Sequence, residues 1–369
     1  MLEDRFSIIG AGIAGLTLAL SLQTQGISCA IYKSRPSPQN IGGAVMLSPN
    51  SLKLFDDMSI YNDLKQLGYS FDTLYFRDVA GSPKETYPFG SVEKYGYSGL
   101  RVYRYQLIDL LLQKLTTTNI PIYYNHKFSH VVSESEDTIS SLLIDADGIH
   151  SRVRKYTYPE LSPKFTGMVG ITAAVPTANL RLPTRDYKMP VTIIEVLIGK
   201  QKRMPELSRS GWNDFYADKE AAVAFLREGA EVFGDIAVTA TSDIPHEHIN
   251  IWPFHVILNL PSWSSQARRV LLVGDTAHAL PPSSGQGISQ AVEDVVMLAM
   301  LLGKGKSGKQ DLGWWQEYRQ DRLEQILLLN ARGTEEKDDE QGFDLDWLYG
   351  HDVVKEVQRY ISGLGVEGV

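Results

Sequence analysis

The sequence predicts an α/β protein built in three layers, and three observations support this fold class. A short apolar strand, a glycine-rich turn and a helix follow one another near the N-terminus. A second buried strand with a glycine turn recurs near residue 270 and again leads into an apolar helix. Residues 69–99 and 165–255 show the loose alternation of polar and apolar residues that is typical of antiparallel sheet.

The first unit has clear boundaries. Residues 6–9 read as a buried strand, residues 14–25 as a helix that ends at Gly26, and residues 28–32 as a second strand. A strand, a glycine turn, a helix and a strand at this spacing form a right-handed βαβ unit, which predicts a Rossmann-like parallel sheet.

The later elements extend this architecture. Further parallel strands are expected at residues 120–124 and 270–273, the first of them returning to the sheet of the βαβ unit. Helices are expected at residues 106–115, 219–228, 288–302 and 312–331, and the second of these interrupts the β pattern of residues 165–255.

Composition excludes several classes of protein. The chain has 369 residues and a net charge of -8, without a cluster of Lys and Arg, so neither nucleic acid nor an anionic membrane is an expected partner. Cys29 is the single cysteine, which fits a reducing, cytoplasmic location. The apolar run at residues 295–302 is far shorter than the roughly 20 residues of a membrane-spanning helix, so we expect no transmembrane helix there, and the acidic residues at the start lead us to expect no signal peptide. We expect a monomer or homodimer.

The glycine turn has the spacing of a dinucleotide-binding fingerprint. Gly10 allows the tight turn, Gly12 lets the backbone approach a pyrophosphate, and Gly15 lets the helix pack closely on the strand. The phosphates would lie at the N-terminus of the helix, where free N–H groups favour anions.

The acidic residue that usually binds the ribose about 20 positions later is absent. Lys33 occupies this place, and Arg35 follows nearby. One interpretation is a dinucleotide bound more weakly by about one to two powers of ten, because a charge-assisted hydrogen bond of roughly 1.5–3 kcal/mol is lost. The alternative is that Lys33 and Arg35 bind the 2′-phosphate of NADP.

A second motif favours the first interpretation. The strand at residues 270–273 ends in Gly274-Asp275, and a loop with two prolines leads through Gly285-Gln286-Gly287 into a helix. This segment resembles the Gly-Asp motif of the FAD-dependent aromatic hydroxylases, single-component flavoprotein monooxygenases of the para-hydroxybenzoate or salicylate hydroxylase type. The resemblance implies that Asp275 binds the ribityl part of FAD and that the loop with Pro281 lies along the isoalloxazine ring. It also implies that Gly285, Gln286 and Gly287 point a helix N-terminus at the pyrimidine carbonyl, where a helix dipole stabilises reduced flavin.

Three further segments are similar to the same family. Asp147-Gly148 matches its Asp-Gly motif, which lies near the FAD pyrophosphate, although Asp145 replaces the usual glycine and must turn outward to avoid repelling the phosphates. Gly43-Ala44 matches the segment that passes beside FAD, and Arg104 matches the arginine that reaches FAD at the start of a helix.

The resemblance implies a domain organisation and an activity. The FAD-binding domain would comprise residues 1–70, 100–164 and 265–303, interleaved with a substrate-binding β-sheet domain of residues 71–99 and 165–264; a helical region, 304–369, would follow. The implied activity is that of a monooxygenase, in which NADPH or NADH reduces FAD and O₂ forms a flavin C4a-hydroperoxide that hydroxylates or epoxidises an aromatic compound or secondary metabolite. Because the sequence has one fingerprint in a strand-to-helix turn, NAD(P)H would bind only transiently.

The substrate is not specified by any motif. Trp212, Tyr216, Arg203 and His255 are candidates to line its pocket, but no catalytic residue is assigned. His246-Glu247-His248 lacks further ligands at a suitable spacing, so no metal site is expected.

Two other functions stay open. One is a flavin oxidase or reductase of the same fold that does not oxygenate. The other is a catalytically impaired member of the family, suggested by Lys33, Asp145 and two segments, between residues 134 and 142 and between 185 and 198, that look shortened.

Overall fold

The central element of the chain is a five-stranded parallel sheet. The structure, a computed structural model, describes residues 6–38, 43–77, 83–134, 142–182, 184, 204–228, 230–257, 260–332 and 345–363. The strand order is β12-β9-β1-β2-β8, with Ile8 of β1 between Ile31 and Ile144. The strands are β1 (Phe6–Ile9), β2 (Cys29–Tyr32), β8 (Ile122–Tyr123), β9 (Leu143–Asp145) and β12 (Val270–Leu272). The predicted return of the chain near residue 120 is confirmed, since β8 pairs in parallel with β2.

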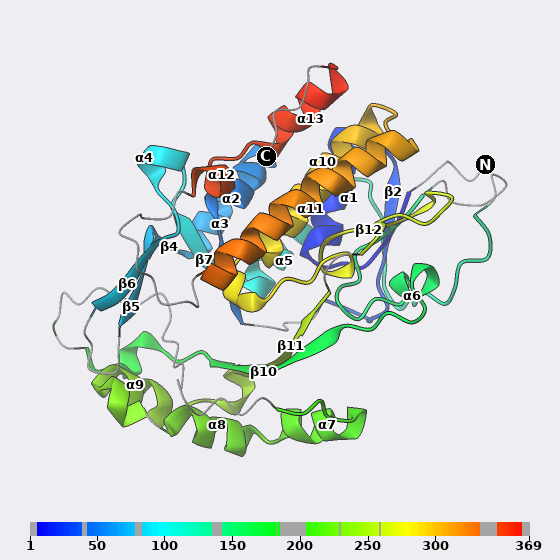
Figure 1. Ribbon diagram of the computed structural model, residues 1–369. Coiled ribbons are helices and arrows are strands. Elements are labelled where there is room, and N and C mark those ends of the chain that lie inside the picture. The colour runs from blue at the N-terminus through cyan, green and yellow to red at the C-terminus, as the bar shows by residue number, and fades with distance from the viewer. Residues whose placement is uncertain are drawn as a thin grey trace.

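Helices pack against this sheet and against one another. Helix α1 (Ile13–Thr24) contacts β1 and β2 and packs on α5 (Arg104–Thr116) and α10 (Gly287–Gly303). Helix α10 also contacts α2 (Pro49–Asp57) and two C-terminal helices, so that most of its circumference is buried (Figure 1). This position explains why its sequence is apolar nearly all round rather than on one face.

A second, antiparallel sheet lies beyond the helices. Its strand order is β3-β7-β4, from strands β3 (Ala44–Leu47), β7 (Gly99–Tyr103) and β4 (Tyr69–Phe71). Leu47, Leu100 and Val102 on one face are buried in the main core, and β7 contacts both α5 and α3 (Tyr61–Leu67). The helices therefore lie between two sheets, and the predicted α/β fold class is confirmed.

A further β unit lies at one end of the molecule. The long strands β10 (Lys164–Ala173) and β11 (Ile249–Val256) pair antiparallel, and helices α7 (Arg209–Ala217), α8 (Lys219–Arg227) and α9 (Asp235–Ser242) lie beside them (Figure 1). Strand β5 (Thr73–Arg77) pairs with β6 (Pro83–Pro88) nearby. Two short helices lie outside this unit (Figure 1): α4 (Val92–Tyr95), whose Tyr95 hydrogen-bonds to Asp346, and α6 (Arg154–Thr157), which follows β9.

The predicted helix at residues 219–228 is confirmed by α8, but the expectation of β structure on either side of it is wrong for residues 209–217 and 235–242, which form α7 and α9. Local capping explains the helices: Ser208 accepts a hydrogen bond from Gly211 N at the start of α7, and Asp218 accepts one from Ala221 N at the start of α8. Val223 then buries its side chain against Ile249 of β11, so the helices cover one face of the strand pair.

The C-terminal part of the chain packs on α10. A hydrogen-bonded turn at residues 304–308 reverses the chain into α11 (Lys309–Arg332), which runs alongside α10 (Figure 1). Helix α12 (Asp346–Tyr349) contacts α2, and α13 (Val353–Ile361) contacts α10. Within the described residues, none of the helices is both long and apolar enough to cross a membrane. The domain boundaries given above stay a prediction.

Candidate functional site

Three predicted motifs follow neighbouring parallel strands. Gly10 directly follows β1. Asp147 is the second residue after β9, and Gly274 is the second residue after β12. These strands are adjacent in the order β12-β9-β1, and the carboxyl ends of parallel strands lie at the same edge of a sheet. The fold therefore brings together segments that are up to 264 residues apart in the sequence at the edge where α/β proteins bind ligands.

The three glycines of the fingerprint have different surroundings. A Cβ atom at Gly10 would lie 2.3 Å from the carbonyl oxygen of Ala146, and one at Gly15 would lie 2.0 Å from the carbonyl oxygen of Gly10. Gly10 also has a φ of +116°, which L side chains rarely adopt. At Gly12, by contrast, a Cβ would meet nothing within 4 Å. Gly10 and Gly15 are thus required by packing, and Gly12 faces the open side of the turn.

The N-terminus of α1 is available to an anion. Gly12 is its N-cap, with no side-chain cap and no acidic residue in the first turn. Leu16 N is the first to donate to the N-cap carbonyl, which leaves the preceding N–H groups of the helix free for phosphate oxygens.

Cationic side chains surround this end of the sheet. Lys33, directly after β2, is half-buried, and burial together with the charge of Arg35 lowers its pKa, whereas Asp147 acts in the opposite direction. Arg104 at the start of α5 also lowers the pKa of Lys33. The structure therefore brings Lys33, Arg104 and Asp147 within electrostatic reach of one another, as a site for pyrophosphate requires.

The Asp-Gly turn differs from the sequence-based expectation at Asp145. Its side chain does not turn outward but is fully buried, and it accepts hydrogen bonds from Ser151 Oγ at 2.6 Å and from Asp147 N at 3.2 Å. Burial, reinforced by the charge of Asp147, raises the pKa of Asp145 well above its ordinary value. A raised pKa favours the neutral acid, which does not repel phosphates.

The other residues of this turn face outward. Asp147 is exposed, and its carboxylate accepts a hydrogen bond from Arg152 N at 3.2 Å. Gly148 has a φ of +92° and open space where a Cβ would lie. Arg154, to which the sequence assigned no role, is buried and donates to the carbonyl oxygens of Ile149 and Thr276, at 2.5 Å and 3.0 Å. It therefore ties the Asp-Gly turn to the Gly-Asp segment.

Asp275 lies within electrostatic reach of Arg104. Many protein atoms surround its side chain, but the side chain remains accessible to solvent. It therefore faces a recess at the edge of the sheet. This depth raises the pKa of Asp275, while Arg104 and His278 act to lower it. Gly274, with a φ of +58°, donates its N–H to Asp294 Oδ2 at 3.0 Å, which holds the turn in place.

The loop after Asp275 leads to a second uncapped helix N-terminus. Gly285 has a φ of +62°, Pro281 precedes the turn, and Gln286 is the N-cap of α10 without a side-chain cap. Gly287, the first residue of α10, has nothing within 4 Å of where a Cβ would lie. Gln286 is buried and donates to Ser48 Oγ at 3.1 Å.

That hydrogen bond connects α10 to the segment at residues 43–50. Ala44 pairs with Tyr103 in the antiparallel sheet, and Arg104 N donates to the carbonyl oxygen of Gly43 at 3.2 Å. A Cβ at Gly43 would lie 3.3 Å from Thr172 Oγ1 of β10. The predicted residues Gly43, Ala44 and Arg104 are therefore neighbours, and they lie between the sheet edge and the strand pair β10–β11.

These residues fit FAD. The site offers two uncapped helix N-termini, open space at Gly12, cations near the phosphate position and an exposed carboxylate at Asp275. A family model described as the FAD binding domain matches residues 5–328 of the chain. The chain belongs to this FAD-binding family. FAD is accordingly its cofactor, as the motifs predicted.

Known relatives of this flavoprotein are monooxygenases by name. It is 25% identical to 6-hydroxynicotinate 3-monooxygenase of Bordetella bronchiseptica, over 96% of this chain and 97% of the relative. It is 27% identical to 3-amino-4-hydroxybenzoate 2-monooxygenase PtmB3 of Streptomyces platensis, over 92% of this chain and 88% of that protein. Among solved structures, CtdE in complex with FAD and substrate 4 superposes with a TM-score of 0.73 at 20% identity, covering 98% of each chain, which shows a shared fold. The predicted membership of the FAD-dependent aromatic-hydroxylase family is confirmed.

A buried network of charges supports the flavin loop from behind. Asp294 of α10 lies 2.6 Å from His278 Nε2 and accepts a hydrogen bond from Arg319 Nε at 2.8 Å. Glu293 pairs with Arg319 and with Arg322, whose Nε lies 3.2 Å away. Burial would raise the pKa of Glu293, but the two guanidinium groups outweigh it and lower that pKa to about 2. No sequence motif indicated the arginine partners of Glu293 and Asp294.

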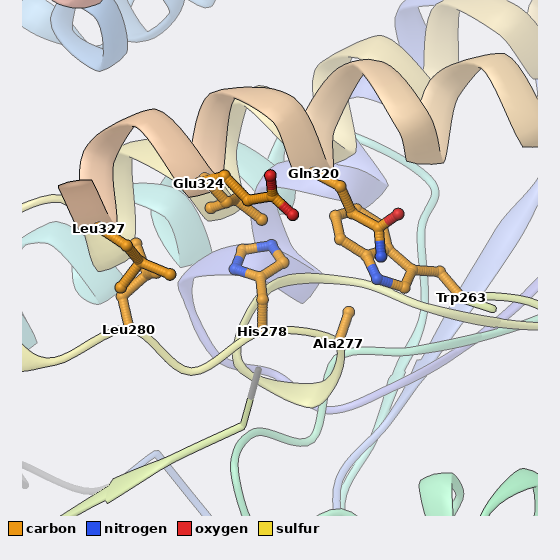
Figure 2. A pocket seen from close by; sticks show the side chains of 8 residues that line it. Trp263, Ala277, His278, Leu280, Gln320, Glu324 and Leu327 are labelled. Atoms are coloured by element: carbon orange, nitrogen blue, oxygen red, sulfur yellow. The ribbon is translucent and has the colours of Figure 1, made fainter. Parts of the chain in front are cut away.

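His278 marks the rear side of the Gly-Asp segment. Figure 2 shows its ring beneath α11, where Gln320 and Glu324 project toward it. The ring lies 5.0 Å from that of Trp263, and both line a cavity of about 20 Å³, which has room for about one water molecule. This side of the segment is packed and too small for a cofactor or substrate.

The residues expected to line the substrate pocket lie together in part. The Trp212 ring stacks on Tyr216 at 5.9 Å and meets Phe165 edge to face at 5.3 Å, and Phe165 lies 5.3 Å from His255. This aromatic cluster lies at the end of the β10–β11 pair that meets the Asp-Gly turn, because the ring of His255 lies 5.5 Å from that of His150. Arg203 and the two segments that looked shortened, between residues 134 and 142 and between 185 and 198, lie largely or wholly outside the described residues.

No metal centre is visible in the part of the chain that the structure describes. Its His, Cys, Asp and Glu side chains form no group of three or more that could hold a metal ion. His246 and His248 lie on a short turn of 3-10 helix, where His246 is paired with Glu220.

Proposed function

We propose that this chain is an FAD-dependent monooxygenase that consumes NAD(P)H and O₂ and hydroxylates or epoxidises an aromatic compound or a secondary metabolite. The observation that carries the proposal is the sheet edge at which Gly12, Asp147 and Asp275 converge, next to the two uncapped helix N-termini. The names of the relatives, which act on hydroxylated aromatic acids, support the reaction type.

The proposal assigns each part of FAD to residues of this edge. Gly10, Gly12 and Gly15 would receive the pyrophosphate at α1, with Arg104, Asp147 and Gly148 around it, and Lys33 would lie at the adenosine ribose. Asp275 would bind the ribityl hydroxyls. Gly43, Ala44 and the loop from Gly274 through Pro281 to Gly285, Gln286 and Gly287 would lie along the ring.

The bound FAD supplies electron transfer from NAD(P)H and the activation of O₂, and transfer of oxygen from a flavin C4a-hydroperoxide is part of the same proposal. The chain contributes the positive end of α10, which stabilises negative charge at the pyrimidine side of the ring. Its sheets contribute a water-poor surrounding that limits the loss of reduced oxygen as peroxide.

NADPH or NADH would bind only transiently. Within the described residues, the glycine fingerprint lies in one strand-to-helix turn, and the similar spacing at residues 303–308 follows a helix and forms a hydrogen-bonded turn. We also propose a cytoplasmic location, which a lone buried cysteine supports, and a monomeric or homodimeric state.

The proposal is tested by comparing the amounts of NAD(P)H and O₂ consumed with the amounts of product and H₂O₂ formed. The FAD-loaded protein is mixed with NADPH or NADH and a panel of phenols and aromatic acids, while NAD(P)H oxidation, O₂ uptake and H₂O₂ are measured together. A monooxygenase consumes one NAD(P)H and one O₂ for each hydroxylated product with at least one compound. If peroxide accounts for all O₂ with every compound, the chain is a non-oxygenating oxidase; if NAD(P)H never reduces the flavin, it is a reductase of other specificity or an impaired family member.

A further inference from the structure

Arg101 lies at the middle of β7, the central strand of the antiparallel sheet. In this sheet it pairs with Met46 of β3 on one side and with Tyr69 of β4 on the other. Directly opposed residues of an antiparallel ladder project to the same face of the sheet. Leu100 and Val102, which flank Arg101 in sequence, are buried in the main core, so Arg101 projects away from this core together with Met46.

This second face of the sheet is directed at the flavin loop. A Cβ at Gly285 would lie 3.8 Å from Met46 Cε and 3.4 Å from Phe89 Cε2. The Phe89 ring stacks on Phe71 at 5.1 Å, and Phe71 pairs with Gly99, two residues before Arg101 on the same face. Arg101 therefore lies on the same face as Met46, next to the buried ring pair of Phe71 and Phe89, and this face is beside the loop expected to lie along the isoalloxazine ring.

The guanidinium of Arg101 has no counter-charge. Its side chain is half-buried, and in the described part of the chain it has neither an ion pair nor a hydrogen-bond partner. Burial lowers the pKa of Arg101. The group that acts to raise this pKa is the side chain of Tyr103 and not a carboxylate. The buried arginines of the α10–α11 network, by contrast, each have carboxylate partners. A half-buried cation without a partner is costly, and an anionic ligand would remove that cost.

We propose that Arg101 binds an anionic substituent, a carboxylate or phenolate, of the aromatic substrate. The guanidinium fork can hold a carboxylate by two parallel hydrogen bonds, and the half-buried side chain of Met46 would contact the ring of the same molecule. This inference rests on the proposed function, because it places the substrate beside the flavin loop. It makes Arg101 a residue that selects charged aromatic substrates over neutral ones.

The experiment measures binding to the oxidised holoenzyme, without turnover. The FAD-loaded protein is titrated with 4-hydroxybenzoate, 2-hydroxybenzoate and 6-hydroxynicotinate, and in parallel with the carboxamide of each, and the perturbation of the flavin absorption spectrum gives Kd. The wild type is expected to bind at least one of the acids about tenfold or more tightly than its amide, as a charge-assisted hydrogen bond predicts.

Variants assign this preference to Arg101. Arg101→Met should abolish it, Arg101→Lys should retain part of it, and Arg209→Met, at an exposed arginine of α7, should leave it unchanged. Flavin content and thermal unfolding show that each variant is folded; should Arg101→Met not fold, Arg101→Gln replaces it.

Three results would overturn the inference: equal affinity for acid and amide in the wild type, failure of all three acids to bind, or a preference that persists in the folded variant lacking the guanidinium. None of these depends on oxygenation. If the protein prefers the acids but releases only peroxide, the proposed function is refuted and the anion site at Arg101 is supported. If the protein oxygenates a substrate but shows no preference for the acids, the proposed function is supported and the anion site is refuted.

Discussion

The glycines of the fingerprint have different roles: Gly15 is needed for packing, whereas Gly12 leaves space for a ligand. Gly15 has no room for a Cβ, because it lies against the carbonyl oxygen of Gly10, whereas Gly12 has open space and an ordinary φ of −94°. The sequence predicts these roles from spacing alone, since the turn is local and its geometry depends on few neighbours.

Substitutions at these two positions should therefore fail in different ways. We expect Gly12→Ala to keep the thermal stability of the apoprotein but to weaken FAD at least about tenfold, because the methyl group occupies the position of the pyrophosphate. Gly15→Ala should lower the free energy of unfolding by about 1–3 kcal/mol, because the backbone must shift. Thermal unfolding of the apoprotein and FAD titration check both, and a stability loss in Gly12→Ala would contradict the open geometry.

Lys33 offers a second test at this scale. Arg35 and Arg104 lower the pKa of Lys33 because their positive charges repel its ammonium group. Replacing Lys33 with an acid removes this repulsion and restores an acceptor for the ribose hydroxyls. Lys33→Glu should tighten FAD by about tenfold, measured by quenching of flavin fluorescence. An unchanged Kd for FAD with a weakened affinity for NADPH would instead favour the 2′-phosphate interpretation of Lys33.

Asp145 illustrates what a motif cannot reveal. Its position next to a phosphate site suggested an outward carboxylate, but Ser151, six residues later, folds back to bind it and allows it to be buried. The relevant contact is formed by the turn as a whole, and no spacing rule indicates it.

At the scale of elements, α10 and α11 are joined by charge as well as by apolar contacts. The helices were predictable from their apolar periodicity, but the pairing of Asp294 and Glu293 with Arg319 and Arg322 depends on how the helices cross. Helix α8 was predicted, but α7 and α9 were missed; the ring of Trp212 in α7, for example, packs on Phe165 of β10, a contact that the fold makes between distant parts of the chain.

Removal of one partner from this network should be costly. We expect Arg319→Met to lower the free energy of unfolding by about 3–5 kcal/mol, because two buried carboxylates each lose a guanidinium partner. Arg181→Met is the matched control: its pair with Asp235 is exposed, with 3.8 Å between charged atoms, and should contribute less than about 1 kcal/mol. Urea unfolding followed by circular dichroism measures both, and similar losses in the two variants would contradict the role of the network.

The contact between α11 and the segment before α13 predicts a pH dependence. His351 Nε2 lies 2.6 Å from Tyr318 Oη, and burial together with Arg322 lowers the pKa of His351 to about 4. Since the unfolded chain takes up this proton near pH 6.5, the stability that the neutral imidazole contributes is complete above pH 6.5. It is lost as the pH falls toward 4, with a slope of at most about 1.4 kcal/mol per pH unit. His351→Gln should flatten urea-unfolding stability across this window, and an unaltered slope would exclude His351 as its source.

For the molecule as a whole, one topological fact organises the site. Strands β12, β9 and β1 are neighbours although their motifs are far apart in the sequence, so their carboxyl ends form one edge. The sequence predicts β1, β12 and the three turns, and the resemblance of the motifs supplies their common ligand. The substrate side was less predictable, because Arg101 belongs to no motif and is marked only by its missing partner and its position beside Met46.

We expect that FAD binding depends more on Asp275 of the Gly-Asp segment than on Lys33, which stands where the fingerprint usually has an acid. Calorimetric titration of the apoprotein with FAD tests this most directly in the wild type, Asp275→Ala and Lys33→Ala. We expect one FAD per chain in the wild type, a loss of affinity of about tenfold or more in Asp275→Ala, and little change in Lys33→Ala. Equal losses in the two variants, or unchanged FAD affinity in Asp275→Ala, would show that Asp275 does not have the larger role in FAD binding.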